Sequence, residues 1–438
     1  MSRVEPADVH ATLRRHLLVT GHPIVLDLER SHGLWVRDAL GGGEFLDFAG
    51  FYASNALGFH HPGLEDEPTR KRLLEAALLK VGNPDFYTSE LATFVNTLER
   101  TAAPSTLPHY FFVEGGALAV ENAMKAAMDW KVRKNQSRGL GELGTEILHF
   151  EQAFHGRSGY TLSVTNTDPA KTLHFPKFDW PRIPSPAARF PLTGANLEAT
   201  ESAEAAALST IARAFDERGT RIAAILCEPI QGEGGDNHFR PEFLQALRRV
   251  ADEREALLIF DEVQCGVGIT GKWWAHEHAN LRPDLLCFAK KLQVGGFFAS
   301  TRIDDVDNVF KVPSRISSTW GGALVDMVRG TRILELIVAE NLLENAAARG
   351  RELLAGLEAL EAEFPTRVTG ARGRGLMCAF DLPDTAARNA LVKHCFAAGM
   401  FVLAGGNRTI RLRPALTVSA ELVAECLARL RGALSAPV

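Results

Sequence analysis

Two apolar segments, each ending at charged residues, constrain the fold of this chain more than any other feature. Residues 257–260 (LLIF) are followed by Asp261 and Glu262, and residues 285–288 (LLCF) are followed by Ala289 and Lys290. Short apolar runs that alternate with helical segments are typical of parallel strands buried on both faces. Ligands bind at the carboxyl edge of such a sheet. We therefore expect Asp261 and Lys290 to point into one site.

A lysine and an acid at this edge suit one cofactor in particular. Pyridoxal 5′-phosphate needs a lysine amine for a Schiff base and a carboxylate that keeps its ring nitrogen protonated. Taken singly, Asp261 is more often a turn cap and Lys290 a surface residue. Their matched positions after two buried strands favour the cofactor site.

Size, charge and cysteine content exclude several classes of protein. A chain of 438 residues exceeds one ordinary core, so we expect two domains. A net charge of −5 gives no basic surface for nucleic acid or for an anionic membrane. The six cysteines form no CxxC pair, and no apolar run approaches the roughly 20 residues of a membrane span. We expect a soluble cytoplasmic protein with reduced cysteines.

Strands and helices alternate through the middle of the chain, which predicts an α/β fold with a central, mostly parallel sheet. An N-terminal segment, residues 1–61, should form a short helix and an antiparallel meander that join a smaller domain. Residues 62–325 should form the large domain, beginning with one helix over 62–80. Residues 326–438 should form the small α+β domain. A helical stretch over 323–364, broken near Asn341, connects the two, and the strands expected beyond it are 375–382, 401–404 and 409–413.

Three loops that follow predicted strands carry further candidate site residues. The turn Glu114-Gly115-Gly116-Ala117 precedes a long helix, where free backbone amides and the helix dipole make an anion cradle. The loop Phe154-His155-Gly156-Arg157 offers an aromatic ring, an imidazole and a guanidinium for ring stacking and carboxylate binding. A third loop, residues 227–235, carries acids after the strand 222–226.

These segments resemble class III (fold type I) pyridoxal-phosphate aminotransferases over nearly the whole chain. The resemblance rests on FFVEGGALAVENAMKAA, AFHGRSGY, TNTDP, CEPIQGEGGDNHFRPEF, LIFDEVQCGVGITG, PDLLCFAKK, SSTWGG, GRGLMCAF and IRLRPALTVS. The EGGALAVENA and GEGGDNHFRPEF segments are most similar to the enzymes of that family that act on the ε-amino group of L-lysine.

The resemblance implies a role for each candidate residue. Lys290 would bind the cofactor covalently and shuttle a proton, with Lys291 as a bystander. The other cofactor contacts would be Asp261 at the ring nitrogen, Gln264 at the ring hydroxyl, Phe154 and His155 beside the ring, and Gly116 and Ala117 at the phosphate, completed by Thr319 from the partner subunit of a homodimer. Arg157 would bind the far carboxylate of the amino donor. Arg411 would bind the α-carboxylate of the oxo-acid, with Glu233 neutralising Arg411 while lysine is bound.

The implied reaction transfers the ε-amino group of L-lysine to 2-oxoglutarate, giving 2-aminoadipate 6-semialdehyde, which cyclises, and glutamate. Ser317 stands where the resemblance predicts a larger amide, and Leu292 where it predicts a hydroxyl residue. Ornithine or 4-aminobutyrate as donor is the nearest alternative, because one methylene changes binding by only about 1–3 kcal/mol. A catalytically idle pyridoxal-phosphate protein is a second alternative. A third is a metal protein using His155, His174 and cysteines, whose spacing matches no ligand pattern, so we expect no metal site.

Overall fold

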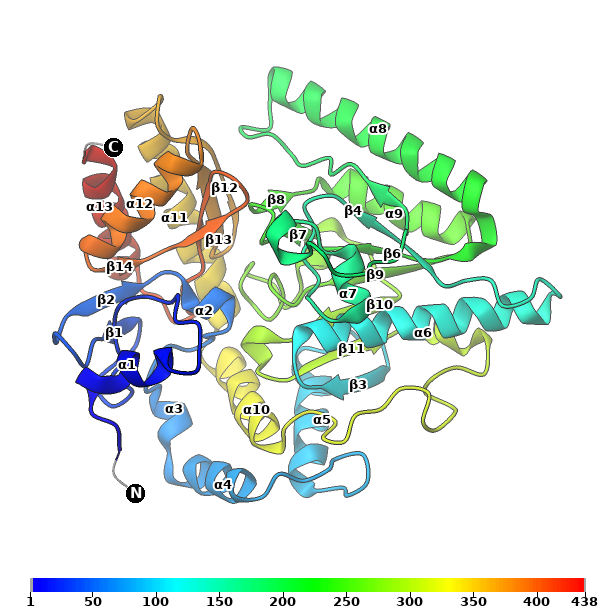
Figure 1. Cartoon of the computed structure of the whole chain (residues 1–438), viewed down its shortest axis with the longest axis horizontal. Helices are drawn as coiled ribbons and strands as arrows, with labels where there is room; N and C mark the ends of the chain where they lie inside the picture. Colours follow the sequence, from blue (N-terminus) through cyan, green and yellow to red (C-terminus); the bar gives the residue numbers. More distant parts are fainter. Residues whose placement is uncertain (1–2, 437–438) are drawn as a thin grey trace.

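The computed structural model describes residues 3–436, and a seven-stranded sheet forms its centre (Figure 1). The strand order is β3-β11-β10-β9-β6-β4-β5. Only β11 runs antiparallel to its neighbours β10 and β3, so the predicted mostly parallel sheet is confirmed. The strands are β3 (His109–Val113), β4 (Glu146–Phe150), β5 (Arg182–Ile183), β6 (Ile222–Cys227), β9 (Leu257–Asp261), β10 (Leu285–Phe288) and β11 (Gly295–Ala299).

Alternating strand residues bury the two faces of this sheet in separate apolar clusters. Leu257 and Ile259 pack in the cluster that contains the inner face of helix α6 (Gly116–Ser137). Leu258 and Phe260 pack in the larger cluster, which includes residues of α8 (Gly194–Arg218) and α9 (Pro241–Glu253). Each fully buried Leu or Ile contributes about 1.5–3 kcal/mol. This alternation fixes the register of β9, because a shift by one residue would exchange its two faces.

Two consecutive long helices connect the region of the sheet to the C-terminal part of the chain. The predicted helical stretch 323–364 is confirmed as α10 (Leu324–Ala339) and α11 (Leu342–Glu363), and Asn341 between them is left-handed, with φ 52°. The other helices before it are α1 (Val9–Arg14), α2 (Gly50–Ala53), α3 (Pro62–Glu65), α4 (Glu67–Leu78), α5 (Ser89–Thr101) and α7 (Gly159–Val164).

The single helix predicted over 62–80 is wrong, because the chain breaks between α3 and α4. Asp66 is extended, with φ −61° and ψ 148°, and its side chain accepts a hydrogen bond from Thr69 N at 2.8 Å. Pro68 stands in the first turn of α4, where its missing N–H leaves no hydrogen bond unmade. A capping acid followed by proline therefore starts a new helix at this point.

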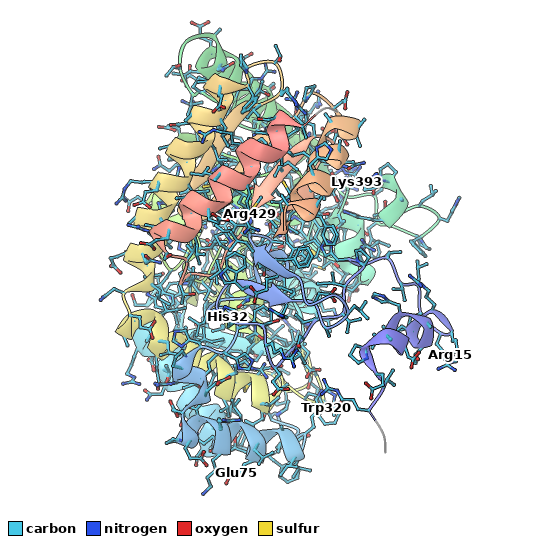
Figure 2. The ribbon with its side chains drawn as sticks, turned by 90° about the vertical axis from the view of Figure 1, so that its left-hand side faces the viewer. Arg15, His32, Glu75, Trp320, Lys393 and Arg429 are labelled. Atoms are coloured by element: carbon cyan, nitrogen blue, oxygen red, sulfur yellow. The ribbon has the colours of Figure 1, made fainter. Side chains whose placement is uncertain are left out.

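The N-terminal segment joins the C-terminal part of the chain through a three-stranded sheet of order β1-β2-β14. β14 (Met400–Phe401) pairs in parallel with β2 (Glu44–Asp47), and β1 (Trp35–Arg37) pairs antiparallel with β2. Figure 2 shows Arg429 on the C-terminal helix above this segment, and its guanidinium lies 5.3 Å from the centre of the Trp35 ring.

A separate four-stranded antiparallel sheet, of order β12-β13-β16-β15, lies beside this segment in Figure 1. The strand predicted over 401–404 is therefore divided, since β14 pairs with the N-terminal segment and β15 pairs with β16. The elements are β12 (Thr369–Arg374), β13 (Met377–Asp381), α12 (Thr385–Ala397), β15 (Leu403–Gly405), β16 (Thr409–Leu412) and α13 (Ala420–Ser435), and the short hairpin of β7 (Ile230–Gln231) and β8 (Asn237–His238) stands apart. Within the described part of the chain, no helix is long and apolar enough to cross a membrane.

Candidate functional site

A cavity of about 490 Å³ lies at the carboxyl edge of the large sheet. It brings together residues from distant segments of the chain, including Asp261 at the end of β9 and Lys290 after β10. Of the site residues predicted from the sequence, the cavity is lined by Gly116, Ala117, Phe154, His155, Arg157, Glu233, Asp261, Gln264 and Lys290. Arg411 contacts two of these residues, whereas Thr319 is exposed and lies outside the lining.

The register of two parallel strands places Asp261 near Lys290. Asp261 pairs with Cys287 across β9 and β10, so the chain of β10 continues only three residues further to reach Lys290. Lys290 has a left-handed backbone, with φ 40°, which bends the chain sharply after the strand. Burial lowers the pKa of the Lys290 amine, and neighbouring carboxylates only partly oppose that effect. A lowered pKa leaves more of the amine neutral, as a nucleophile requires.

The neighbouring lysine turns away from the cavity. Lys291 is 1 % exposed, and its Nζ donates a hydrogen bond to the Ala53 carbonyl at 2.9 Å. Burial lowers the pKa of this amine to about 7. Lys290 and Lys291 therefore have different surroundings although they are adjacent, and only Lys290 lines the cavity.

Asp261 is held by two hydrogen bonds in a nearly closed environment. His155 Nδ1 donates to Asp261 Oδ2 at 2.8 Å, and Val263 N donates to Oδ1 at 3.0 Å. The His155 and Asp261 side chains are 0 % and 5 % exposed. His155 thereby orients the carboxylate and shields it from water. A buried, oriented carboxylate can stabilise a proton on a ring nitrogen placed against it.

The N-terminus of α6 borders the same cavity and could hold a phosphate. Gly115 precedes the helix with φ 90°, and no side chain caps the first turn. A Cβ added at Gly116 would lie 2.8 Å from Val263 Cγ1, so the turn requires glycine there. Uncapped amides at a helix N-terminus bind anions well. Lys290, Asp261 and this turn together fit the amine, ring nitrogen and phosphate contacts of pyridoxal phosphate.

Arg411 and Glu233 form an ion pair beside the cavity. Arg411 Nη2 lies 3.0 Å from Glu233 Oε2, and Arg411 Nη1 donates to Gln264 Oε1 at 3.3 Å. Burial acts to raise the pKa of Glu233, but Arg411 and Lys171 outweigh it and lower that pKa below its usual value. Glu233 is therefore ionised and neutralises one positive charge at this end of the cavity.

Several residues that lie in or beside this site were not predicted from the sequence. Glu228 lines the cavity and accepts hydrogen bonds from Phe154 N and Gly232 N, both at 3.0 Å; burial raises the pKa of its carboxyl. Its position directly after β6 was a signal of the same kind as Asp261 after β9. The position of Ser54 in the cavity lining and the contact of Lys171 with Glu233 had no such signal, because both depend on segments that are distant in the sequence.

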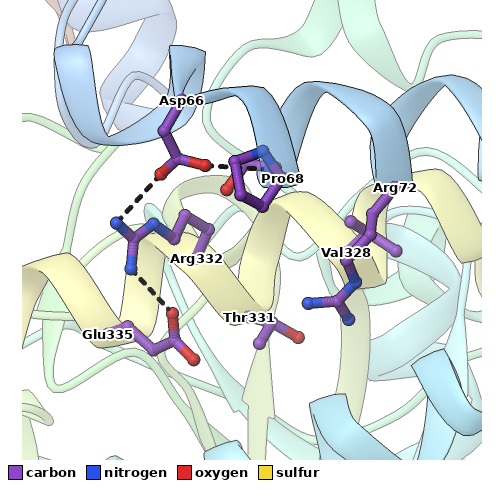
Figure 3. Close-up of a pocket in the computed structure, with 8 residues that line it drawn as sticks. Asp66, Pro68, Arg72, Val328, Thr331, Arg332 and Glu335 are labelled. Atoms are coloured by element: carbon purple, nitrogen blue, oxygen red, sulfur yellow. Dashed lines mark hydrogen bonds and ion pairs between the residues drawn. The ribbon is translucent and has the colours of Figure 1, made fainter.

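A second cavity lies away from these residues and lacks their chemistry. It has a volume of about 340 Å³ and lies between α4 and α10 (Figure 3). There Arg332 bridges Asp66 at 3.2 Å and Glu335 at 3.0 Å, with no lysine amine or glycine turn among the lining residues. Between residues 3 and 436, no three His, Cys, Asp or Glu side chains are grouped to hold a metal ion.

Comparison with known proteins agrees with this geometry. The family model for aminotransferase class-III matches residues 18–434. L-lysine-epsilon aminotransferases of Mycobacterium tuberculosis and Amycolatopsis lactamdurans are 52% and 50% identical, and each alignment covers 98% of this chain and 96% of the relative. The solved structure of "Lysine aminotransferase from M. tuberculosis in the internal aldimine form" superposes with a TM-score of 0.96, covering 98% of this chain and 99% of that one. This chain belongs to the class III aminotransferases.

Proposed function

We propose that this chain is a homodimeric, pyridoxal-phosphate-dependent enzyme that transfers the ε-amino group of L-lysine to 2-oxoglutarate. The products would be 2-aminoadipate 6-semialdehyde, which cyclises, and glutamate. The observation that carries the proposal is the 3.0 Å pair of Glu233 and Arg411 beside the Lys290 cavity. The high identity to L-lysine-epsilon aminotransferases supports the choice of lysine as donor.

Different residues of the cavity would contact different parts of the cofactor. Bound pyridoxal phosphate supplies an electron sink for the charge left on carbon when a proton is removed. Asp261, oriented by His155, would hold the proton on the ring nitrogen, and Gln264 would contact the ring hydroxyl. The amides of Gly116 and Ala117 would bind the phosphate, and Phe154 would pack on the ring face.

Lys290 would serve as both the covalent attachment point and the proton carrier. In the first half of the reaction its Nζ would carry a proton from the substrate carbon that bears the reacting amine to the methine carbon of the cofactor, and in the second half it would carry a proton from that methine to the α-carbon of the oxo-acid. The buried position that lowers its pKa supports this role. Lys291 would stay a structural residue that holds the Ala53 carbonyl.

Substrate choice would depend on Arg157, Glu233 and Arg411. Arg157 is exposed and lines the cavity, where it would bind the carboxylate of lysine far from the reacting amine. Glu233 would cancel the charge of Arg411 so that the cationic ε-amine meets no bare guanidinium. In the second half, Arg411 would bind the α-carboxylate of 2-oxoglutarate after Glu233 moves away.

A homodimer would complete the phosphate site through Thr319 of the second subunit. Thr319 is exposed, and its loop lies against the segment around residue 83, because Trp320 O accepts a hydrogen bond from Asn83 N at 3.3 Å. Exposed apolar side chains can mark an interaction surface. Those of Trp320 and of the neighbouring segment 78–87 that support this proposal are Leu78 (77%), Leu79 (69%), Phe86 (71%), Tyr87 (84%) and Trp320 (37%).

The proposed domain division keeps the boundaries that were expected from the sequence. Residues 62–325 would form the large cofactor-binding domain, and 326–438 the small domain together with residues 1–61. The parallel pairing of β14 with β2 supports assigning the N-terminal segment to the small domain.

A panel of amino donors with 2-oxoglutarate tests the function. We expect L-lysine to give the highest rate of glutamate formation and a cyclic imine as second product. Ornithine, one methylene shorter, should be slower by about 10–200-fold in kcat/KM. A tenfold preference for ornithine or 4-aminobutyrate would contradict the donor assignment. No glutamate from any donor, with cofactor bound, would favour an idle cofactor-binding protein.

A further inference from the structure

Glu233 is bound by two cations at once, each through a different oxygen. Arg411 Nη2 lies 3.0 Å from Oε2, and Lys171 Nζ lies 2.7 Å from Oε1. Lys171 is not among the residues that line the cavity. Because Lys171 and Arg411 bind different oxygen atoms of Glu233, the contact between Lys171 and Glu233 can persist when Glu233 releases Arg411.

Arg411 itself cannot follow a moving partner. It extends from β16 with a side chain that is 0 % exposed, and its Nη2 also donates to the Ala404 carbonyl at 2.7 Å. A Cβ added at Gly405 would collide with the guanidinium, so the backbone packs directly against it. Arg411 is a fixed cation, and any change in its pairing must come from Glu233.

The backbone of Glu233 is also fixed, which leaves only its side chain free to move. Gly406 N donates to the Glu233 carbonyl at 2.9 Å, and Gly235 N donates to the Gly232 carbonyl at 3.1 Å. The next residue, Gly234, packs so closely on the Gln152 carbonyl that no Cβ would fit. The Glu233 side chain is 26% exposed, which leaves it room to rotate.

Lys171 is held in place on the far side of Glu233. It ends the short 3₁₀ turn Pro169–Lys171, whose first residue is preceded by Asp168, and that carboxylate accepts from Ala170 N at 2.9 Å. Lys171 Nζ donates to Thr167 Oγ1 at 3.2 Å and lies 5.3 Å from the centre of the Phe154 ring. The ammonium is thus positioned by its own loop and not by Glu233 alone.

We propose that Lys171 is a positioning residue that retains Glu233 after Glu233 releases Arg411 to the α-carboxylate of a dicarboxylate substrate. The inference rests on the proposed function, because it assumes that Arg411 receives such a carboxylate. A carboxylate that is three-quarters buried is costly to leave without a cation. Lys171 removes that cost, and its positive charge also weakens the hold of Glu233 on Arg411.

Loss of Lys171 should therefore act on one substrate class only. Glu233 would then have Arg411 as its single cation, so a substrate carboxylate would compete less well for Arg411. Lysine, which is bound while Glu233 stays on Arg411, should be little affected. A purely structural role would instead weaken both halves of the reaction.

Equilibrium binding of glutarate to the holoenzyme tests the inference without turnover. Glutarate has two carboxylates but no amine or carbonyl, so titration calorimetry reports only carboxylate binding. We expect Lys171→Gln to weaken binding about tenfold, or about 1.4 kcal/mol, and Lys171→Arg to restore it to within about threefold. Lys177→Gln is the matched control, because Lys177 belongs to the same loop and bonds only the Thr172 carbonyl, at 3.0 Å.

The Glu233→Ala background shows whether Lys171 acts through Glu233. There Lys171→Gln should leave glutarate binding unchanged. Equal weakening in both backgrounds would mean that Lys171 binds the carboxylate directly, and would overturn the proposal. So would unchanged binding in the single variant, or no glutarate binding by the wild type. Failure of the wild type to use lysine would refute the proposed donor, but the coupling between Lys171 and Glu233 would still be measured.

Discussion

Replacing Asp261 with asparagine should abolish most turnover while leaving the fold intact. The carboxylate is 5% exposed and accepts from His155 Nδ1 at 2.8 Å and from Val263 N at 3.0 Å. Asparagine can still accept the hydrogen bond from Val263 N. Its side chain carries no negative charge, however, and it has one acceptor oxygen fewer to offer to His155. A neighbouring carboxylate raises the proton affinity of a cationic group by about 1–3 pKa units. The protonated ring should thus become about 10–1000-fold rarer, and we expect turnover to fall about 100-fold.

Single-turnover kinetics with L-lysine, followed at the cofactor absorbance, measure this effect apart from product release. Glu262→Gln is the control, because Glu262 is an equally buried acid at the same strand end that bonds Ala275 N and His276 N and lies outside the cavity lining. That variant should lose stability, by about 1–3 kcal/mol, without a 100-fold loss of rate. If Asp261→Asn retains cofactor and reacts within threefold of wild type, the proposed role of Asp261 is refuted.

Three further predictions follow from the same structure. Borohydride reduction and peptide mapping should find the cofactor on Lys290, and a label on Lys291 would contradict the assignment. Thr319→Ala should weaken cofactor retention, measured by dialysis, and dilution of the wild type to monomers should have the same effect; a monomer that retains cofactor as tightly as the dimer would refute the shared site. Burial lowers the pKa of His149 to about 3, so only the unfolded state gains this proton as pH falls below about 6.5. Between pH about 6.5 and about 3, His149 should therefore decrease the free energy of unfolding by about 1.4 kcal/mol per pH unit, and urea denaturation should show a shallower decrease in His149→Gln.

Much of the large domain could be predicted because its signals are local. The apolar run before Asp261 is buried on both faces, so composition alone distinguishes it from a surface strand. The break at Asn341 was also visible in the periodicity of the flanking helices. The single helix predicted over 62–80 is wrong because the prediction treated this polar segment as continuous, whereas the side-chain cap at Asp66 and the proline at position 68 start a new helix there.

Pairing between distant segments was beyond the reach of sequence patterns. Residues 401–404 have one continuous strand pattern, yet Phe401 pairs with the N-terminal segment and Leu403 with β16. The outcome depends on where the N-terminal segment lies, and no local propensity encodes that position.

The sequence by itself determined that Asp261 and Lys290 follow two buried strands, because the residues next to them are enough to predict a buried strand and the position of its end. Only the tertiary structure decided that β9 and β10 are adjacent and parallel, which brings the two residues to one cavity. It also decided that Lys290 faces this cavity while Lys291 faces Ala53, and that Glu233 bridges Arg411 and Lys171. Contacts of this kind join residues up to 238 positions apart, and the packing of whole elements, not local preference, sets their distances.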